Sequence, residues 1–527
     1  MINGSGFFVN ATVFTGHGED AFASAFRIED GLVTWVGDAA EVAGQPATDL
    51  GGRTVLPGLL DVHTHPAVMA AQADALDCLP PRVTSLAALL DRLREHPSLG
   101  AGPDAWILGT GFDDARFPEG RAPDARDLDA VSTTQPVLVW RCDGHSASCN
   151  TRALELAGIT AATADPPGAR FERDADGRPT GVLTEIAAVD AVADRIPEPD
   201  TATIARRLAD LDEHFLSHGL TGVCDLLSSF VADPLPTFRA ARELGFRPRV
   251  ALYPGWQPEL ADLTDDDRTG PIRIAGVKVF ADGAFSNRTA WVEDPYPDSC
   301  EHGIRSISDD ELRDAAAWAR RNRVQLAVHA MGDRALNRVV DLLGDDEPWL
   351  DDQPSVRIEH ATLVAPGLVD RLTRARVGIG IATHTIFLFA ETSAYRNNLG
   401  PDQARVAYPI RALYDSGLPL ALTSDRPATA WDDADDVFCS VAAAVRRLAH
   451  DGTDIGQPES ITVPQAVLLY TGRARKLADL GPVGVLEPGA AGDFVVLDRD
   501  VFTVPAEELA EVRVAETWIA GERCWAS

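Results

Sequence analysis

The chain has 527 residues, of which 45% are hydrophobic and 24% charged, a composition typical of a folded protein with a sizeable core. Its formal net charge of −33 argues against nucleic acid or an anionic membrane as a partner, because either would repel such an acidic surface. The sequence has no apolar run of about 18 residues and no signal-like N-terminus, so we expect neither a membrane span nor secretion.

Short stretches of alternating apolar and polar residues, separated by turn residues, occur at both ends of the chain. They lie at residues 7–9, 25–28, 32–37, 493–497 and 516–521. This pattern predicts antiparallel strands joined by tight turns. Because the termini of a compact protein often lie close together, we expect residues 1–57 and 480–527 to form one small β-sandwich.

Between the two ends, apolar strands alternate with amphipathic helices, which is the signature of parallel βα units. The candidate strands are residues 54–62, 220–226, 248–253, 273–280, 324–329, 356–360, 376–381 and 419–423. Eight such strands predict an α/β fold, a (β/α)8 TIM barrel within residues 58–479. The active site of such a barrel lies at the C-terminal ends of its strands.

One connection, residues 67–200, is too long for a single loop between a strand and a helix. It contains apolar strands of its own at residues 106–108 and 137–140, together with its own helices. We interpret it as an α+β subdomain inserted after the first barrel strand, which covers the barrel mouth as a lid.

Side chains of metal-ligand type lie in or just after five of the predicted barrel strands. They are His63, His65, Lys278, His329, His360 and Asp425. His63 and His65 share one face of their strand, since side chains alternate along a strand. A single strand-end histidine is more often a satisfied core residue, but nitrogen and oxygen ligands at five strand ends predict a site for Zn²⁺ or a similar divalent metal.

Longer motifs resemble the amidohydrolase superfamily, in its branch of N-substituted formamide deformylase-like hydrolases, amidohydrolase family 3. They are His63-Thr64-His65 after Leu56-Pro57-Gly58, residues 277–283 (VKVFADG), 328–335 (VHAMGDRA), 358–361 (IEHA), 423–427 (TSDRP), 484–494 (GVLEPGAAGDF) and Asp143-Gly144-His145. The resemblance covers nearly the whole chain. The sequence departs from this branch before His384, where the usual Gln-Pro is missing, and at residues 284–288, where small residues are usual. Both departures fall where substrate would lie.

This resemblance implies the roles of the ligands. His63, His65 and Asp425 would hold one metal, His329 and His360 a second, and Lys278, carbamylated by CO₂, would bridge them. The chemistry is consistent, because burial lowers the pKa of an amine and the neutral amine captures CO₂, which arginine cannot do. Only Lys278 and Lys476 are lysines among 47 basic residues. The alternative is an ordinary lysine beside a single metal.

The resemblance also implies the reaction, hydrolysis of a C–N amide-type bond, other than a peptide bond, by metal-bound hydroxide. The substrate would be an N-substituted formamide or a similar N-acyl compound. Asp425 would take the proton from the water and return it to the leaving nitrogen, while His384 or His145 stabilises the oxyanion. His145 could equally pack the lid.

Three alternatives stay open. The first is a cyclic imide or ureide hydrolase, and the second is an N-acyl-amino-acid hydrolase that uses Arg288 or Arg334 as a carboxylate clamp. The third is a catalytically silent binding protein on the same scaffold. A related deaminase is disfavoured because Gly332 stands where those enzymes place a glutamate.

We expect the chain to work in the cytoplasm, because its seven cysteines are scattered, odd in number and without a CxxC pair. The expected partner is a small-molecule substrate, with no nucleic acid and no membrane. The sequence leaves the formation of a homodimer open.

Overall fold

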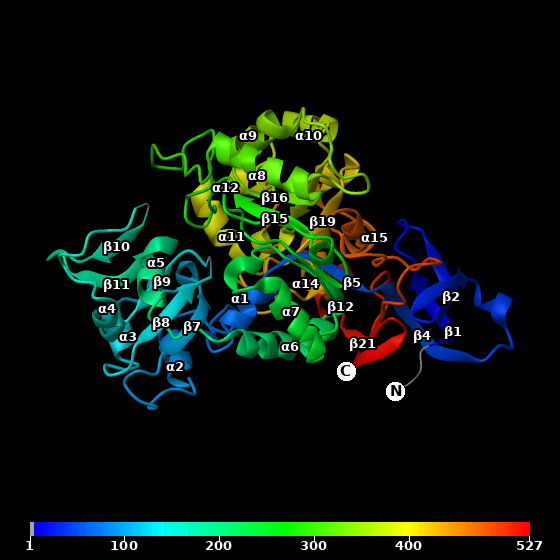
Figure 1. The fold of residues 1–527 in the computed structure, drawn as a ribbon, viewed down its shortest axis with the longest axis horizontal. Coiled ribbons are helices and arrows are strands. Elements are labelled where there is room, and N and C mark those ends of the chain that lie inside the picture. The colour runs from blue at the N-terminus through cyan, green and yellow to red at the C-terminus, as the bar shows by residue number, and fades with distance from the viewer. Residues whose placement is uncertain (1–4, 143, 168) are drawn as a thin grey trace. The chain divides into compact units, whose positions relative to one another are not determined.

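The computed structural model describes residues 5–142, 144–167 and 169–527, so Asp143 and residues 1–4 lie outside the described part. The chain divides into two compact units (Figure 1). The first consists of the residues up to Val68, Thr201–Arg426 and Asp435–Ser527, and the second of Met69–Asp200 and Pro427–Ala434. Helix α1 (Pro66–Ala71) carries the chain from the first unit into the second.

In the first unit, both ends of the chain build a single seven-stranded sheet (Figure 1). Its strand order is β22 (Glu522–Ala526), β21 (Val514–Ile519), β20 (Phe494–Leu497), β4 (Ala47–Pro57), β1 (Gly6–Phe14), β2 (Phe22–Glu29) and β3 (Leu32–Gly37). The antiparallel pair β4–β20 joins the two ends. The prediction that both ends form one β structure is confirmed, and its strands follow one hydrogen-bonded order.

Two parallel sheets make up the rest of the first unit's strands. One has the order β14 (Ile272–Ile274), β13 (Arg249–Leu252), β12 (Leu220–Asp225) and β5 (Leu59–Thr64). The other has the order β15 (Gly276–Phe280), β16 (Gln325–Ala330), β17 (Val356–His360), β18 (Ile379–Thr383) and β19 (Leu420–Leu422).

Backbone hydrogen bonds link these two sheets at two places. In β15, the Lys278 amide donates to the carbonyl oxygen of Pro254, which follows β13, 2.9 Å away. After β19, the Asp425 amide donates to the carbonyl oxygen of His63, at the end of β5, 2.8 Å away. The parallel α/β architecture expected from the sequence is therefore present.

Two of the predicted strands are interrupted. The predicted strand 54–62 is split at Gly58, so that β4 belongs to the terminal sheet and β5 to a parallel sheet. The main chain at Gly58 lies so close to Thr221 that a Cβ atom on Gly58 would be 2.2 Å from Thr221 Oγ1. Only glycine allows this approach. The predicted strand 273–280 is likewise divided at Ala275 into β14 and β15.

Along the chain, helices alternate with the parallel strands. They are α6 (Thr201–Ser217), α7 (Pro234–Glu243), α8 (Asp309–Asn322), α9 (Asp333–Leu343), α10 (Pro366–Arg374), α11 (Thr385–Leu399), α12 (Pro401–Val406), α13 (Ile410–Asp415), α14 (Val437–Arg446) and α15 (Val463–Leu468). Helix α8 illustrates the local cause: Ser308 and Glu311 form a capping box at its N-terminus, and Arg320 and Arg321 lie in its last turn. Both features stabilise a helix.

The second unit is built on a six-stranded mixed sheet. Its order is β10 (Arg170–Arg173), β11 (Pro179–Thr184), β9 (Ala147–Cys149), β8 (Val137–Arg141), β7 (Ile107–Phe112) and β6 (Leu76–Asp77). Its helices are α2 (Leu86–Arg94), α3 (Ala125–Asp129), α4 (Thr151–Ala157) and α5 (Ile186–Ala193). Leu108 and Leu138 pack in one apolar cluster, whereas Ile107 and Val137 pack in another. Since neighbouring strand residues face opposite ways, both faces of this sheet are buried.

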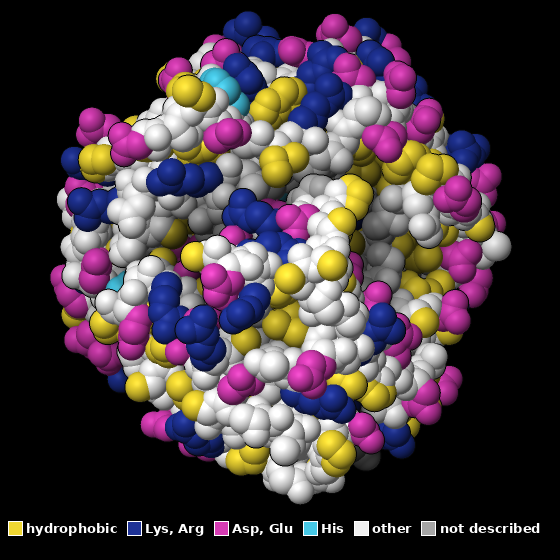
Figure 2. Space-filling view, turned by 90° about the vertical axis from the view of Figure 1, so that its left-hand side faces the viewer, with side chains coloured by type: hydrophobic (Ala, Val, Ile, Leu, Met, Phe, Trp, Pro, Cys, Tyr) yellow, Lys and Arg dark blue, Asp and Glu magenta, His cyan; other side chains and the backbone are white. Residues whose placement is uncertain are grey.

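The role of this unit as a lid stays a prediction. On the face shown in Figure 2, acidic and basic side chains are interspersed. None of the helices in the described part of the chain has the length and apolar character that a membrane span requires.

Candidate metal centre

The predicted metal ligands of the first unit and the predicted catalytic residue His384 all lie at or near the C-terminal ends of parallel strands. His63 is in β5, with His65 just after it; Lys278 is in β15, His329 in β16 and His360 at the end of β17; and His384 and Asp425 follow β18 and β19. The relative exposure of every one of these side chains is 9% or less. The parallel topology explains the gathering, since the strand ends meet at one edge of the sheets.

Asp425 lies at the centre of one ligand group. Its Oδ1 atom is 2.8 Å from His65 Nε2 and 3.2 Å from His63 Nε2. Ligand atoms that each lie 2.0–2.1 Å from one zinc ion are roughly 3 Å apart. The three residues therefore have the spacing of a metal site before any ion is added, and their nitrogen and oxygen donors suit zinc.

A second group places His384 beside the predicted ligands. One ligand nitrogen from each of His63, His360 and His384 lies within 4.8 Å of the other two. The ring centroids of His329 and His360 are 4.3 Å apart, and those of His360 and His384 are 4.6 Å apart. Four imidazoles from four strands thus share one buried space.

Several of these imidazoles have a nitrogen without a hydrogen-bond partner. Within the described part of the chain, these buried atoms are His65 Nδ1, His360 Nδ1 and His384 Nε2. Leaving such an atom unpaired costs about 1–3 kcal/mol. Orphaned nitrogens in a cluster of histidines are what a site for a metal and a substrate requires, because either one would satisfy them.

The pKa values of these groups follow from burial and from their neighbours. Burial lowers the pKa of His384 to about 3, so its imidazole is neutral. Burial also lowers the pKa of His360, and His329 and His384 lower it further. Although burial raises the pKa of Asp425, His63 and His65 hold it well below its usual range. Neutral imidazoles and an ionised carboxylate are the forms that bind metals.

Lys278 is 2% exposed, and its Nζ atom lies 5.1 Å from the centre of the Phe280 ring. Burial lowers the pKa of this amine to about 8, against the opposing effect of Glu359 and Asp425. At neutral pH roughly a tenth of such amines carry a free lone pair. Lys278 can therefore act as a nucleophile, which an ordinary lysine with a pKa near 10.4 does poorly.

Glu359 is a member of the site that our sequence analysis did not identify. Its Oε2 atom accepts a hydrogen bond from His63 Nδ1, 2.7 Å away. Arg357, which is completely buried, donates to both carboxylate oxygens at 2.5 and 3.0 Å. Burial raises the pKa of Glu359, but Arg357 and His63 hold it well below its usual range. The carboxylate fixes the His63 ring so that Nε2 faces Asp425.

Two buried aspartates hold the loops of the site. Asp61 accepts from the His63 amide at 3.1 Å and from the Ser424 hydroxyl, and burial raises its pKa to about 7. Asp282 accepts from the amides of Trp291, Met331 and Gly332 at 2.8–3.0 Å, and burial raises its pKa to about 7. Neither was identified from the sequence, because Asp61 bonds to the distant Ser424 hydroxyl and Asp282 to the backbone amides of distant loops.

The backbone is strained at two of the ligands. His360 has a φ of 72° and Asp425 a φ of 57°, and Ala361 follows His360 with a φ of 48°. Residues other than glycine seldom adopt this left-handed region, and each costs on the order of 1–3 kcal/mol. Such strain gathers at functional sites, where the surrounding fold imposes it.

The remaining candidates make other contacts. His145 belongs to the second unit, where its Nδ1 lies 3.3 Å from Glu185 Oε2. Arg288 donates to Asn398 Oδ1 at 2.9 Å, and Arg334 donates to Glu293 Oε2 at 2.8 Å. Both arginines thus already have side-chain acceptors of their own.

A parallel α/β fold that collects histidines and an aspartate at its strand ends is the arrangement of a metal-dependent hydrolase. Residues 47–524 match the family described as "Amidohydrolase family". The chain therefore belongs to the amidohydrolase family, and the resemblance seen in its motifs is confirmed.

Among curated proteins, the chain is similar to N-substituted formamide deformylase of Arthrobacter pascens, with 28% identity over 97% of each chain. Among solved structures, it is similar to an uncharacterized metal-dependent hydrolase from Pyrococcus horikoshii, with a TM-score of 0.74 and 24% identity over 95% of this chain and 99% of that one. Another such hydrolase, from Pyrococcus furiosus, has a TM-score of 0.71 and 25% identity over 94% and 99%. The chain is a metal-dependent hydrolase of this family.

Proposed function

We propose that the protein hydrolyses the C–N bond of an N-substituted formamide or a similar small N-acyl compound. The observation that carries the proposal is the ligand group around Asp425, whose Oδ1 lies 2.8 and 3.2 Å from two imidazole nitrogens. We further propose that the two parallel sheets form one eight-stranded barrel, because backbone hydrogen bonds join them beside β15 and after β19.

The donor set fits zinc or a similar divalent metal at His63, His65 and Asp425, with His329 and His360 available for a second ion. His329 Nε2 donates to the carbonyl oxygen of Gly283, 3.1 Å away, so Nδ1 is the nitrogen that would hold a metal. Lys278, with its lowered pKa, would bridge the two ions as a carbamate. A bound divalent metal lowers the pKa of a water and polarises a carbonyl group.

The chain's own residues would then move the proton. Asp425 is ionised, so it can accept the proton of the attacking water and deliver it to the leaving nitrogen. His384 is neutral, and its Nε2 atom has no partner in the described part of the chain. In the tautomer with its proton on Nε2, this N–H would donate a hydrogen bond to the oxyanion that forms on the carbonyl oxygen.

The side chains around the histidines favour an uncharged, apolar N-substituent. The Phe387 ring stacks on His384 at 4.9 Å and on His360 at 5.9 Å, and Phe280 lies 5.2 Å from His329. The two arginines that could clamp a carboxylate are engaged by Asn398 and Glu293. These contacts support a formamide of an apolar amine over an N-acyl amino acid.

A substrate panel tests this proposal. The metal-loaded protein would be assayed against N-benzylformamide, N-formyl and N-acetyl amino acids, cyclic imides and lactones, with the His65→Ala variant as the control for contaminating activity. We expect the N-substituted formamide to have the largest kcat/KM. A preference for amino-acid derivatives or imides by tenfold or more would contradict the assignment of substrate class.

A further inference from the structure

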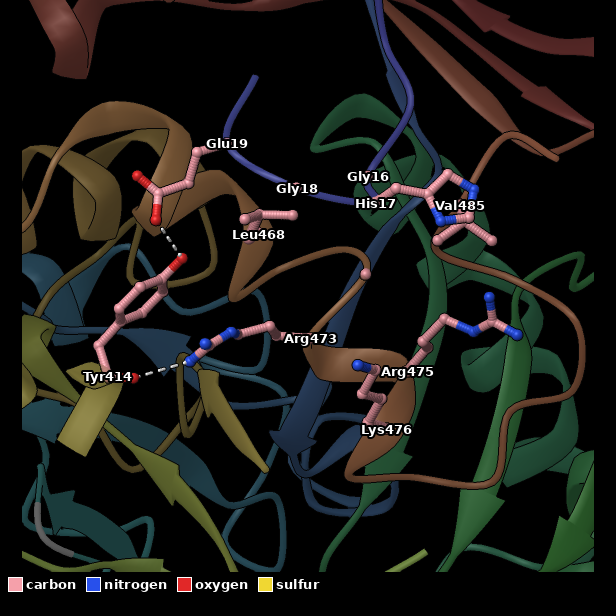
Figure 3. A pocket seen from close by; sticks show the side chains of 11 residues that line it. Gly16, His17, Gly18, Glu19, Tyr414, Leu468, Arg473, Arg475, Lys476 and Val485 are labelled. Carbon is pink, nitrogen blue, oxygen red and sulfur yellow. Dashed lines mark hydrogen bonds between the residues drawn. The ribbon is translucent and has the colours of Figure 1, made fainter. Parts of the chain in front are cut away.

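The first unit contains a cavity of about 350 Å³ to which none of the metal-type ligands contributes. It is lined by the turn 16–19 between β1 and β2, by Tyr414 of α13, and by residues 472–476, which include the short helix η6 (Ala474–Lys476) (Figure 3). This volume lies in the range of small-molecule sites, which is about 300–1,000 Å³. The catalytic proposal gives this cavity no role.

Basic side chains gather in this cavity although the chain carries a net charge of −33. They are His17, Arg473, Arg475 and Lys476. Glu487 neutralises part of the group, since it pairs with Arg475 at 3.1 Å and with His17 at 3.3 Å. Within the described part of the chain, neither Arg473 nor Lys476 has an ion pair with a carboxylate. Both are therefore free of direct ion pairs there, and one of their two charges remains in excess after Glu19, which also lines the cavity, is counted.

Arg473 is held in place by neutral contacts. Its guanidinium carbon lies 3.8 Å from the centre of the Tyr414 ring, and its Nη1 donates to the Tyr414 carbonyl oxygen at 3.1 Å. The Tyr414 hydroxyl in turn donates to Glu19 Oε1 at 3.0 Å (Figure 3). A stacked guanidinium keeps most of its N–H donors for a ligand and loses little freedom on binding one.

Glu19 lines the cavity as well, and its Oε1 atom accepts hydrogen bonds from two neutral groups. The same Oε1 atom that accepts from Tyr414 also accepts from Gln465 Nε2 at 3.1 Å. In Figure 3, Glu19, Tyr414 and Arg473 lie on one side of the cavity, and His17 and Arg475 lie on the other. Glu19 therefore lies on the side of Arg473, and Arg473 and Lys476 still have N–H donors that an anion can accept from.

Two glycines let the backbone segments that form the wall of the cavity lie close together. A Cβ atom on Gly472 would lie 1.8 Å from the carbonyl oxygen of Gly16. Gly16 itself has a φ of +80°, and a Cβ atom there would lie 2.8 Å from the carbonyl oxygen of Gly484. Larger residues cannot replace either glycine, so the backbone of the turn and that of residues 472–476 stay in close contact.

We propose that this cavity binds a small polyanion, such as pyrophosphate, a phosphorylated metabolite or a polycarboxylate. Arg473 and Lys476 provide the charge, and the stacked guanidinium provides the planar donors that phosphate and carboxylate groups accept. The ligand would connect the terminal sheet to the segments after β19. It would stabilise the folded chain by mass action and leave the chemistry at Asp425 unchanged.

The test is isothermal titration calorimetry of the full-length, metal-loaded protein with inorganic pyrophosphate and, separately, with citrate, at constant ionic strength. We expect one equivalent to bind. The double variant Arg473→Gln/Lys476→Gln should bind at least tenfold more weakly. The control Arg323→Gln/Arg374→Gln makes the same change in charge at two exposed arginines and should bind as the wild type does. Comparing the two anions decides whether phosphate or carboxylate is preferred.

Thermal unfolding provides a second readout, with a rise in Tm on the order of 2 °C at saturating anion in the wild type and none in the double variant. Should the double variant not fold, Lys476→Gln alone replaces it, because this side chain is exposed, and a several-fold loss of affinity is expected. The proposal is overturned if neither anion binds saturably, or if the variants bind as tightly as the control.

Discussion

The terminal sheet and the ends of the parallel strands are both buried, but they contain opposite kinds of side chain. In the terminal sheet, Phe8 stacks on Phe26 at 4.9 Å and Phe494 on Trp518 at 5.1 Å, and the Trp518 indole N–H is satisfied by Glu516. At the strand ends, imidazoles crowd together with unpaired nitrogens and a left-handed backbone. The terminal sheet stabilises the fold. At the strand ends, the surrounding fold keeps the imidazoles close together and the backbone strained.

This comparison predicts that changes at the strand ends alter turnover or metal binding, while changes in the terminal sheet alter stability alone. The largest effect is expected for Asp425→Asn, because an amide cannot accept the proton of the attacking water. We expect kcat to fall by a factor on the order of 10²–10⁴. The matched control is Asp493→Asn, a buried aspartate beside β20, which should keep kcat within a few-fold. Equal losses of kcat in both variants would contradict the prediction that only the strand ends affect turnover.

Lys278→Ala should lose both bound metal and activity, since the carbamate proposed to bridge the ions could no longer form. Formate, acetate or propionate should restore part of both, because truncation leaves room for a small carboxylate. Lys278→Arg should not recover, since guanidinium stays protonated and repels the metals. Metal content and kcat with and without 50 mM acetate, roughly a thousandfold excess over protein, measure this. Full activity of Lys278→Ala without acid would exclude the bridge.

The protonation of Lys278 also gives a pH dependence. Only the neutral amine reacts with CO₂, and the pKa of Lys278 is lowered to about 8. Uptake of ¹³C-bicarbonate by the metal-free protein, followed by NMR, should therefore rise as the pH increases through about 8 and be small near pH 6. A signal that persists in Lys278→Ala would place the label elsewhere.

Glu359→Gln should weaken metal binding by about 10–100-fold, because the His63 ring loses the charged group that orients it. Competition with a chelating dye measures the affinity. The control is Glu516→Gln in the terminal sheet, where the carboxylate also pairs with an arginine, Arg53, at 2.7 Å. That variant should bind metal as the wild type does. A similar loss in both would assign the effect of Glu359 to general destabilisation.

The smallest effect is expected for Ile28→Val, which removes one methyl group from the completely buried core of the terminal sheet. The free energy of unfolding should fall by about 1 kcal/mol, while kcat and metal content stay the same. Urea unfolding followed by fluorescence measures the change. A loss of activity at unchanged stability would show that the two regions are more closely coupled than their side chains suggest.

The sequence predicted the side chains of the site better than the network that holds them. His63, His65 and Asp425 were found because they follow apolar strands, and parallel strand ends meet. The hydrogen bond between His63 and Glu359 spans 296 residues, and no local pattern encodes such a distance. Arg357 and Glu359 did leave a signal, since a buried strand seldom carries two charged residues on one face.

Element boundaries were harder to predict, for the same reason. The division of the strand at Gly58 depends on the closeness of Thr221, a residue more than a hundred positions away. The segment Pro427–Ala434, which begins two residues after Asp425, belongs to the second unit, and its composition does not mark it as different. Contacts between distant residues decide both cases.

The pairing of β4 with β20 has a consequence for how the protein is made. β4 ends at Pro57, but its partner strand begins only at Phe494. During translation, β4 therefore keeps one edge without a partner until nearly all of the first unit has been synthesised, and an open strand edge can pair with other chains. A ribosome that stalls in between would release an aggregation-prone fragment. Co-expressed chaperones should therefore increase the yield of soluble protein, and a slow step late in refolding should coincide with the docking of β20.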